Sequence, residues 1–242
     1  MLAPSVQSWM MGLIPNSIQR LRRLWPSTYS WIQRNKGKYL SGESKMLERT
    51  DGLKCTTTNI HPKYCNTGSK LRRIKGTPCS GCYGHKGNYL FPTVQSAMDR
   101  KYETLMTDRY WVLHMALAID DADLHRWQGN GDLQGIGHLI KIVAVAYLRP
   151  DVMFWLPTLE HETVNEYLAA GGPIPGNLVI RRSSTKVDQH LPMRVGHSSM
   201  VTTTGNVPYG TFICESLSRG GICGDCMACW DKKYLRIAYR KH

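Results

Sequence analysis

An alternation of strand-like and helix-like segments between residues 124 and 182 is the feature that most constrains the fold. Strands are predicted at 124–127, 152–157 and 177–182, and the segments between them carry apolar residues at helical spacing, at 138–149 and 161–170. Strand–helix–strand repeats at such short spacing give parallel strands joined by right-handed crossovers. The sequence therefore predicts an α/β fold with a parallel sheet.

The rest of the chain has weaker periodicity. One long helix is predicted at 93–118, because Pro92 precedes its first turn and apolar residues fall among charged ones. The segments 51–90 and 185–212 are rich in Gly and Thr and lack a clean period, so loops are expected there. We expect a single α/β domain at 51–242, preceded by a basic, partly flexible N-terminal extension at 1–50.

Positive charge is concentrated in the N-terminal third. The chain has a net charge of +13, and residues 1–76 contain 14 Lys and Arg against three acidic residues. Such a segment is typical of contact with nucleic acid or another polyanion, and a solvated leader is the equal alternative. Within it, S-I-Q-R-L-R-R-L-W at 17–25 predicts a short basic amphipathic helix that ends before Pro26. Packing of this helix against the protein's own body is favoured over a membrane or DNA surface.

Signals for a membrane or for export are weak. The longest apolar runs fall short of the roughly 18–20 residues that a membrane span needs. The first residues lack the charged start of a signal peptide. We therefore expect a cytoplasmic protein without a membrane span, in which clustered cysteines bind metal more often than they form disulfides. A secreted disulfide scaffold is the minor alternative.

Eight cysteines form two groups of four, on either side of the alternating segment. The first group is Cys55, Cys65, Cys79 and Cys82, and the second is Cys214, Cys223, Cys226 and Cys229. The run at 223–229 has the C-x2-C-x2-C spacing that wraps a [4Fe–4S] cluster. Structural zinc more often uses two separated C-x2-C pairs, and the first group supplies one such pair. An iron–sulfur cluster is therefore favoured over zinc for the second group. For the first group, zinc and an iron–sulfur cluster stay open. The chain would hold one cluster or two.

Histidines are the other candidate metal ligands. His61 and His85 flank the first cysteine group, where a surface histidine in a loop is the favoured interpretation. His125 and His138 bracket the segment 127–132, where a functional role is more plausible, although a hydrogen-bonded structural histidine is favoured there as well.

Five motifs in a fixed order resemble those of a family of bacteriophage proteins of unassigned function. They are C-S-G-C-Y-G at 79–84, R-W-Q-G-N-G-D-L at 126–133, F-W-L-P-T-L-E at 154–160, N-L-V-I-R-R-S-S at 177–184 and C-G-D-C-M-A-C-W at 223–230. The match runs from about Cys55 to the carboxyl terminus. That family is distantly similar to the radical-SAM enzymes, and this resemblance implies a partial TIM-barrel-like fold with cysteine-rich loops at both ends.

The resemblance also implies a cofactor. A radical-SAM [4Fe–4S] cluster has three cysteine ligands, here Cys65, Cys79 and Cys82, and one iron open for S-adenosylmethionine, with Tyr83 packing beside it. The usual C-x3-C-x2-C spacing is absent, and Cys55 as a fourth thiolate would close the cluster and make it structural. In the second motif, this chain has Gln128 and Asn130 at the two positions where the phage family that it resembles has His and Ser.

In such a barrel the chemistry lies at the carboxyl ends of the strands. The resemblance thus makes Asp132 and Glu160 candidate catalytic residues, and Tyr83, Gly129, Gly131, Asp132, Arg181 and Ser183 candidate cofactor-binding residues. Structural alternatives exist. Asp132 would cap the helix at 138–149, Glu160 would favour the start of the helix at 161–170 through the helix dipole, and Trp127, Phe154 and Trp155 would be core aromatics.

Two functions are expected from these features. The first is a radical-SAM-like iron–sulfur protein acting on nucleic acid or nucleotides in the cytoplasm of an infected host cell. The alternative is a non-enzymatic module, stapled by zinc or a cluster, that binds nucleic acid or a host protein.

Overall fold

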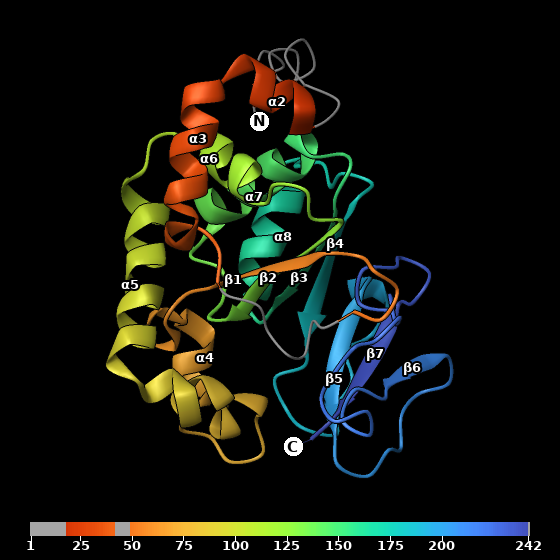
Figure 1. The fold of residues 1–242 in the computed structure, drawn as a ribbon. Coiled ribbons are helices and arrows are strands. Elements are labelled where there is room, and N and C mark those ends of the chain that lie inside the picture. The colour runs from red at the N-terminus through yellow and green to blue at the C-terminus, as the bar shows by residue number, and fades with distance from the viewer. Residues whose placement is uncertain (1–17, 42–48, 242) are drawn as a thin grey trace.

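A computed structural model describes residues 18–41 and 49–241 of the chain. Its centre is one seven-stranded sheet in which all neighbouring strands are parallel, in the order β1-β2-β3-β4-β5-β7-β6 (Figure 1). The strands are β1 Cys55–Asn59, β2 Leu124–Asn130, β3 Met153–Thr158, β4 Leu178–Ser183, β5 Ser198–Thr202, β6 Thr211–Cys214 and β7 Arg236–Arg240. Because β1 and β6 are the two edges, the sheet stays open. This confirms the predicted parallel, partial-barrel-like α/β fold.

The described helices all precede β5 in the chain. They are α2 Ile18–Leu24, α3 Pro26–Arg34, α4 Asn66–Leu71, α5 Pro92–Thr107, α6 Trp111–Ala118, α7 Ile136–Leu148 and α8 His161–Ala169. The predicted elements α7, β3, α8 and β4 are confirmed to within two residues, and β2 continues three residues beyond its predicted end. Within the described residues, no helix combines the length and apolar character that crossing a membrane requires.

The prediction of one helix over 93–118 is wrong. The chain forms two helices there, because the backbone at Asp108 is extended, with a ψ of 109°. The Asp108 carboxylate accepts hydrogen bonds from the Tyr110 amide at 2.9 Å and from the Tyr39 hydroxyl at 2.8 Å. Short polar side chains that bond to nearby backbone in this way compete with the helix ladder.

Two segments expected to be loops contain regular structure. Residues 51–90 include β1 and α4, and residues 185–212 include β5 and the start of β6. The sequences of β1 and β5, C-T-T-T-N and S-S-M-V-T, lack the large alternating apolar residues by which strands are found in a sequence. They are strands because neighbouring strands hydrogen-bond to them, which local sequence does not reveal.

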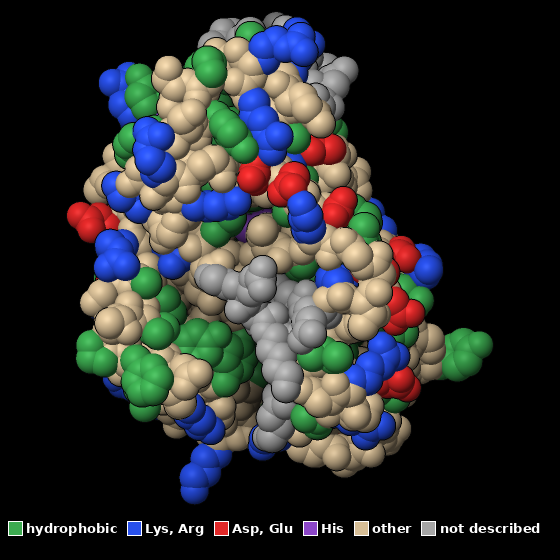
Figure 2. All heavy atoms as spheres, in the orientation of Figure 1, with side chains coloured by type: hydrophobic (Ala, Val, Ile, Leu, Met, Phe, Trp, Pro, Cys, Tyr) green, Lys and Arg blue, Asp and Glu red, His purple; other side chains and the backbone are tan. Residues whose placement is uncertain are grey.

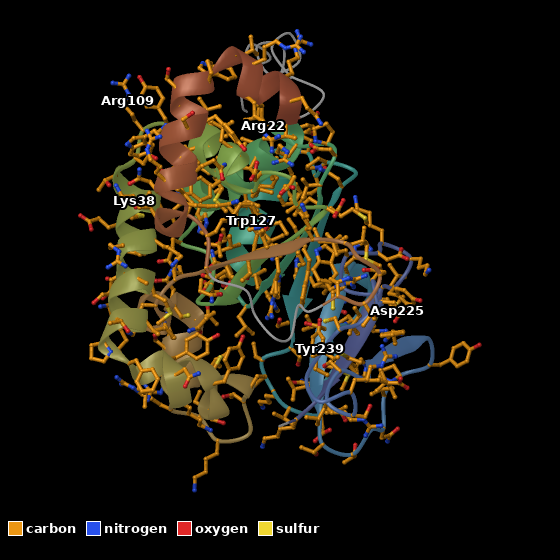
Figure 3. The ribbon with its side chains drawn as sticks, in the orientation of Figure 1. Arg22, Lys38, Arg109, Trp127, Asp225 and Tyr239 are labelled. Carbon is orange, nitrogen blue, oxygen red and sulfur yellow. The ribbon has the colours of Figure 1, made fainter. Side chains whose placement is uncertain are left out.

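One face of the sheet packs against the helices. Trp127, Phe154 and Leu178 of the strands belong to this core together with residues of α6, α7 and α8. Trp127 is labelled in Figure 3. The predicted core positions of Trp127, Phe154 and Trp155 are confirmed, since these side chains are at most 4% exposed.

The N-terminal helices pack on the same core. The basic amphipathic helix is confirmed as α2, and its Ile18 and Leu21 are buried with Ile32 of α3. The Asp120 carboxylate accepts hydrogen bonds from Arg22 and from the Tyr29 hydroxyl, so the basic side of α2 is tied to the loop that follows α6. Packing against the protein's own body is therefore the correct interpretation of this helix.

The opposite face of the sheet is covered by the C-terminal loop. Leu124, Trp155 and Ile237 from the strands form a second apolar cluster with Cys229 and Trp230 of the loop. The Trp155 and Trp230 rings meet edge to face, with centroids 5.2 Å apart. The second cysteine group therefore lies against the sheet face that the helices leave uncovered.

Candidate functional site

Asp132 joins the carboxyl ends of β2 and β3. Its Oδ1 accepts hydrogen bonds from the Thr158 hydroxyl at 2.6 Å and the Leu133 amide, and its Oδ2 accepts one from the Leu159 amide at 2.8 Å. Burial raises the pKa of this carboxyl to about 6, against the lowering effect of the Thr158 hydrogen bond. It does not cap α7, whose N-cap is Gly135. Asp132 thus lies at the strand ends, as predicted.

Glu160, which follows the end of β3, links that strand to the segment that carries the first cysteine group. Its carboxylate accepts hydrogen bonds from the Thr67 amide at 2.8 Å and the Thr67 hydroxyl at 2.9 Å. Thr67 lies in the first turn of α4, two residues after Cys65. Glu160 is the N-cap residue of α8 but makes no side-chain cap hydrogen bond there. This carboxylate therefore positions the helix that follows Cys65.

Two thiols of the first group lie against Gly68 of α4, and the third, Cys82, interacts with both of them. A Cβ atom at Gly68 would lie 3.7 Å from the Cys65 sulfur and 3.6 Å from the Cys79 sulfur, so the two thiols are neighbours across this glycine. Burial raises the pKa of Cys79 to about 12, and the thiol of Cys82, then Asp132 and Glu160, raise it further. The same causes raise the pKa of Cys65. The site is a group of three thiols beside two carboxyl groups.

The cysteine loop packs closely on β2. The Tyr83 hydroxyl donates a hydrogen bond to the Gly129 carbonyl, and Gly84 lies directly against Asn130, where a Cβ would be 2.1 Å from Oδ1. A Cβ at Gly129 would meet Asn59 and Thr57 of β1. Gly131 has a φ of +88°, and a Cβ there would meet Ile60. Both predicted glycines thus permit close approach, but what approaches them is the β1 segment.

Gly84→Ala is expected to loosen this contact. Because the new methyl group would overlap the Asn130 side chain, we expect a loss of about 1–3 kcal/mol in the free energy of unfolding. Gly81→Ala in the same loop is the control, since no atom of residues 18–41 or 49–241 lies within 4 Å of a Cβ there. Urea unfolding of both variants measures the difference, and equal stabilities would show that the loop is not held against β2 in this way.

Gln128 is a candidate that the sequence analysis noted only as a departure from the family motif. Its backbone φ is +52°, a left-handed conformation that is uncommon for residues other than glycine. The side chain is 3% exposed, and neither its amide oxygen nor its amide nitrogen has a hydrogen-bond partner among the described residues. Buried unpaired amides and strained backbone are concentrated at functional sites. Gln128 therefore joins the candidate site residues.

The second thiol group contains five cysteines rather than four. Cys214, Cys223, Cys226 and Cys229 line one cavity next to β6 and β7. Cys55 packs against the same apolar cluster and interacts with Cys223. It begins β1, whereas Cys65, Cys79 and Cys82 follow the carboxyl end of that strand. The prediction that Cys55 belongs to the first group is wrong, because the direction of β1 places it with the second.

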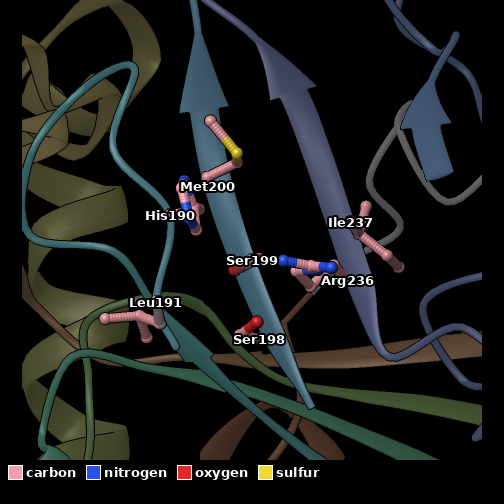
Figure 4. Close-up of a pocket in the computed structure, with 7 residues that line it drawn as sticks. All are labelled: His190, Leu191, Ser198, Ser199, Met200, Arg236 and Ile237. Carbon is pink, nitrogen blue, oxygen red and sulfur yellow. The ribbon is translucent and has the colours of Figure 1, made fainter. Parts of the chain in front are cut away.

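Arg181 and Ser183 are not oriented toward the first thiol group. The fully buried Arg181 guanidinium donates hydrogen bonds to four backbone carbonyls, those of Ala228, Cys229, Asp231 and Tyr234. The Ser183 hydroxyl is 3.2 Å from the Ser199 hydroxyl of β5. A small hollow along β5 and β7, lined in part by Ser199 and Arg236, contains none of the thiols (Figure 4).

Three of the four candidate histidines make hydrogen bonds that hold the fold together. His125 pairs with the Thr56 hydroxyl at 2.9 Å, and His138 accepts a hydrogen bond from the Gln134 amide at 3.2 Å, as the favoured interpretation predicted. His61 is buried rather than at the surface, and its Nδ1 accepts a hydrogen bond from the Lys63 amide. His85 is half-buried beside the first thiol group.

The eight cysteine thiols are all free. All eight cysteines lie in the described part of the chain, and none forms a disulfide. Across the described ranges 18–41 and 49–241, no three Cys, His, Asp or Glu side chains are placed to contact one metal ion together. A tetrahedral zinc would hold its sulfurs about 3.8 Å apart, given Zn–S bonds of about 2.3 Å. A cubane cluster spreads them further, because each thiolate binds a different iron.

The fold and the site together define a cysteine-rich α/β protein built on an open parallel sheet. The chain belongs to the gene product 88 family, a phage-type family of unassigned function, whose model matches residues 33–232. That range includes all eight cysteines and the strand-end residues, so the bacteriophage part of the resemblance is confirmed. No curated protein and no solved structure matches the chain.

Proposed function

We propose that this protein is a radical-SAM-like iron–sulfur protein that acts on nucleic acid or nucleotides. The observation that carries the proposal is the set of three thiols, Cys65, Cys79 and Cys82, at the carboxyl ends of the first strands. Three thiolates leave one iron of a [4Fe–4S] cluster open, whereas a fourth would close it. Cys55, the nearest fourth candidate in the sequence, lies with the other group.

The charges around the three thiols suit the proposed cofactor. Asp132 and Glu160 interact with Cys65 and Cys79, so the site is negative once the carboxyl groups ionise. S-adenosylmethionine carries a sulfonium and an ammonium group, and a nearby carboxylate attracts such cations. When bound, the cluster supplies the electron for reductive cleavage of the sulfonium. Glu160 positions α4 for this, and Asp132 holds the two strand ends together.

Exposed basic and aromatic residues support a nucleic-acid substrate. The end of α4 and the residues after it carry Lys70, Arg72, Arg73 and Lys75, all exposed and all between Cys65 and Cys79 in the chain. Tyr83 and Phe91 nearby in the sequence are 44% and 56% exposed. Positive charge with exposed aromatic rings is the usual combination for binding single strands. Figure 2 shows Lys and Arg distributed over this face of the molecule, with few acidic side chains on the lower helices.

The first experiment is metal analysis with an activity assay. Anaerobically prepared protein should be brown and contain iron and sulfide, and after reduction it should cleave S-adenosylmethionine. Cys79→Ala should abolish cleavage. Colourless protein with stoichiometric zinc and no cleavage would instead support the alternative, a zinc-stapled module without enzymatic activity.

Charge reversal of the α4 segment tests the nucleic-acid part. The variant Lys70→Glu/Arg73→Glu should bind single-stranded DNA or RNA at least about tenfold more weakly at low salt and with a smaller salt dependence, because phosphate contacts are lost. Arg20→Glu/Arg23→Glu on α2 is the matched control, since these exposed residues lie on a helix far from α4 in Figure 1. Fluorescence anisotropy measures both. Equal losses in the two variants would mean that binding is not localised at the thiol site.

Gln128→Gly separates a role in the site from a role in folding. Glycine tolerates the positive φ and removes a buried unpaired amide, so the free energy of unfolding should stay equal or rise by about 1 kcal/mol. Cleavage of S-adenosylmethionine should fall at least about tenfold if the amide contacts a ligand. A stable variant with full activity would remove Gln128 from the site.

A further inference from the structure

The second thiol group connects the two edges of the open sheet. Cys55 begins β1, which is one edge strand, and Cys214 ends β6, which is the other. Both pack against the apolar cluster that contains Cys229. The loop between β6 and β7 supplies Cys223, Cys226 and Cys229, and Cys223 interacts with Cys55, Cys214 and Cys226. Thiols from three separate parts of the chain therefore meet at one place.

The loop that carries these thiols is held rigidly. Arg181 of β4 donates hydrogen bonds to four backbone carbonyls of this loop. From the β1 side, Arg49 donates a hydrogen bond to the Cys226 carbonyl at 2.6 Å, and the Thr50 amide donates to the Gly224 carbonyl. A ligand-bearing loop fixed in this way pre-organises its donors, as metal sites require.

Arginines lie around the second group, whereas carboxyl groups lie around the first. Two carboxylates near the second group are paired with arginines, Glu215 with Arg219 at 3.3 Å and Asp51 with Arg49. Arg49 and Arg126 lie near Cys55 and Cys223, and Arg181 lies near Cys229. The Arg126 guanidinium is 4.7 Å from the centre of the Trp155 ring, which is part of the same apolar cluster. A centre with four thiolate ligands is anionic, and buried arginines offset such charge. The carboxyl groups beside the first thiol group cannot offset negative charge in this way.

We propose that Cys214, Cys223, Cys226 and Cys229 hold a second, closed [4Fe–4S] centre, which fastens the C-terminal loop to the sheet. These four thiols line the cavity, and three of them have the C-x2-C-x2-C spacing. Binding displaces the thiol protons to solvent and leaves one thiolate on each iron. Cys55 lies beside this centre as a fifth, non-ligating thiol. The proposal does not depend on the radical-SAM-like function of the first group.

Iron and sulfide analysis of single variants tests the assignment. Wild-type protein prepared anaerobically should contain about eight irons, from two clusters of four. Cys226→Ser should reduce the count by about half, and Cys79→Ser should do the same by emptying the other site. Cys55→Ser is the matched control, because it removes a neighbouring thiol and should leave the iron count unchanged. Thermal unfolding should shift to lower temperature in Cys226→Ser more than in Cys79→Ser.

The outcomes separate the two proposals. If Cys79→Ser retains all the iron while Cys226→Ser loses it, the second centre stands and the first site fails. If Cys226→Ser retains all the iron, or Cys55→Ser loses half of it, the assignment of the second centre is wrong. If Cys226→Ser does not fold, the iron count of folded Cys79→Ser tests the proposal instead. About four irons are expected there, and a count near zero overturns the second centre.

Discussion

Arg181→Met is expected to lower the free energy of unfolding by at least about 3–5 kcal/mol. The guanidinium is fully buried and satisfies four backbone carbonyls of residues 228–234. Methionine fills part of the volume but donates no hydrogen bond, so several buried carbonyls would be left unpaired, and each costs about 1–3 kcal/mol. The loss should be concentrated in the C-terminal loop, because the four carbonyls are all there.

Hydrogen exchange and urea unfolding measure this prediction. Amides of residues 223–234 should exchange much faster in Arg181→Met, while those of α7 should change little. Arg240→Met is the control, since Arg240 is an exposed arginine at the end of β7. Uniform acceleration across the chain would show that Arg181 supports the whole fold rather than this loop.

Acidification is expected to begin to destabilise the protein below about pH 6.5, where the histidines of the unfolded chain start to bind protons. Burial lowers the pKa of both His125 and His138 to about 3 in the folded state. In the unfolded chain each would titrate near 6.5, so the unfolded state binds more protons between pH 6.5 and 3 and is favoured as pH falls. Each histidine can thus remove up to about 4–5 kcal/mol of stability. Asp132 acts in the opposite sense, because its raised pKa of about 6 makes the folded state the stronger proton binder between about pH 4 and 6.

His125→Phe isolates one of the two histidines. The ring lies 4.3 Å from the Trp127 ring centre and 5.8 Å from that of Phe154, so an aromatic replacement keeps this packing and loses the Thr56 hydrogen bond. Stability at pH 7.5 should change by about 1 kcal/mol or less. The midpoint of acid unfolding, followed by circular dichroism, should move to lower pH. An unchanged midpoint would assign the acid sensitivity to other groups.

Prediction from the sequence worked best where each element carries its own apolar pattern. The helix α7 and strands β3 and β4 are rich in large apolar residues and bounded by Gly or Pro, so local sequence was sufficient. The break at Asp108 was missed because it depends on partners such as Tyr39, which is 69 residues away. The strands β1 and β5 were missed because their side chains are mostly Ser and Thr, and pairing rather than pattern makes them strands.

In the candidate site, too, some features follow from the sequence and others only from the tertiary structure. The sequence alone determined the residue types, the two cysteine-rich segments, the parallel α/β class and the strand-end positions of Asp132 and Glu160, because these follow from spacing along the chain. Only the tertiary structure decided the partners. It placed Cys55 at the opposite end of β1 from Cys65 and turned Arg181 toward the C-terminal loop. It also showed that the Gln128 amide is buried without a hydrogen-bond partner among the described residues. Sequence distance does not report these contacts, because strand direction and crossover connections bring together residues more than a hundred positions apart.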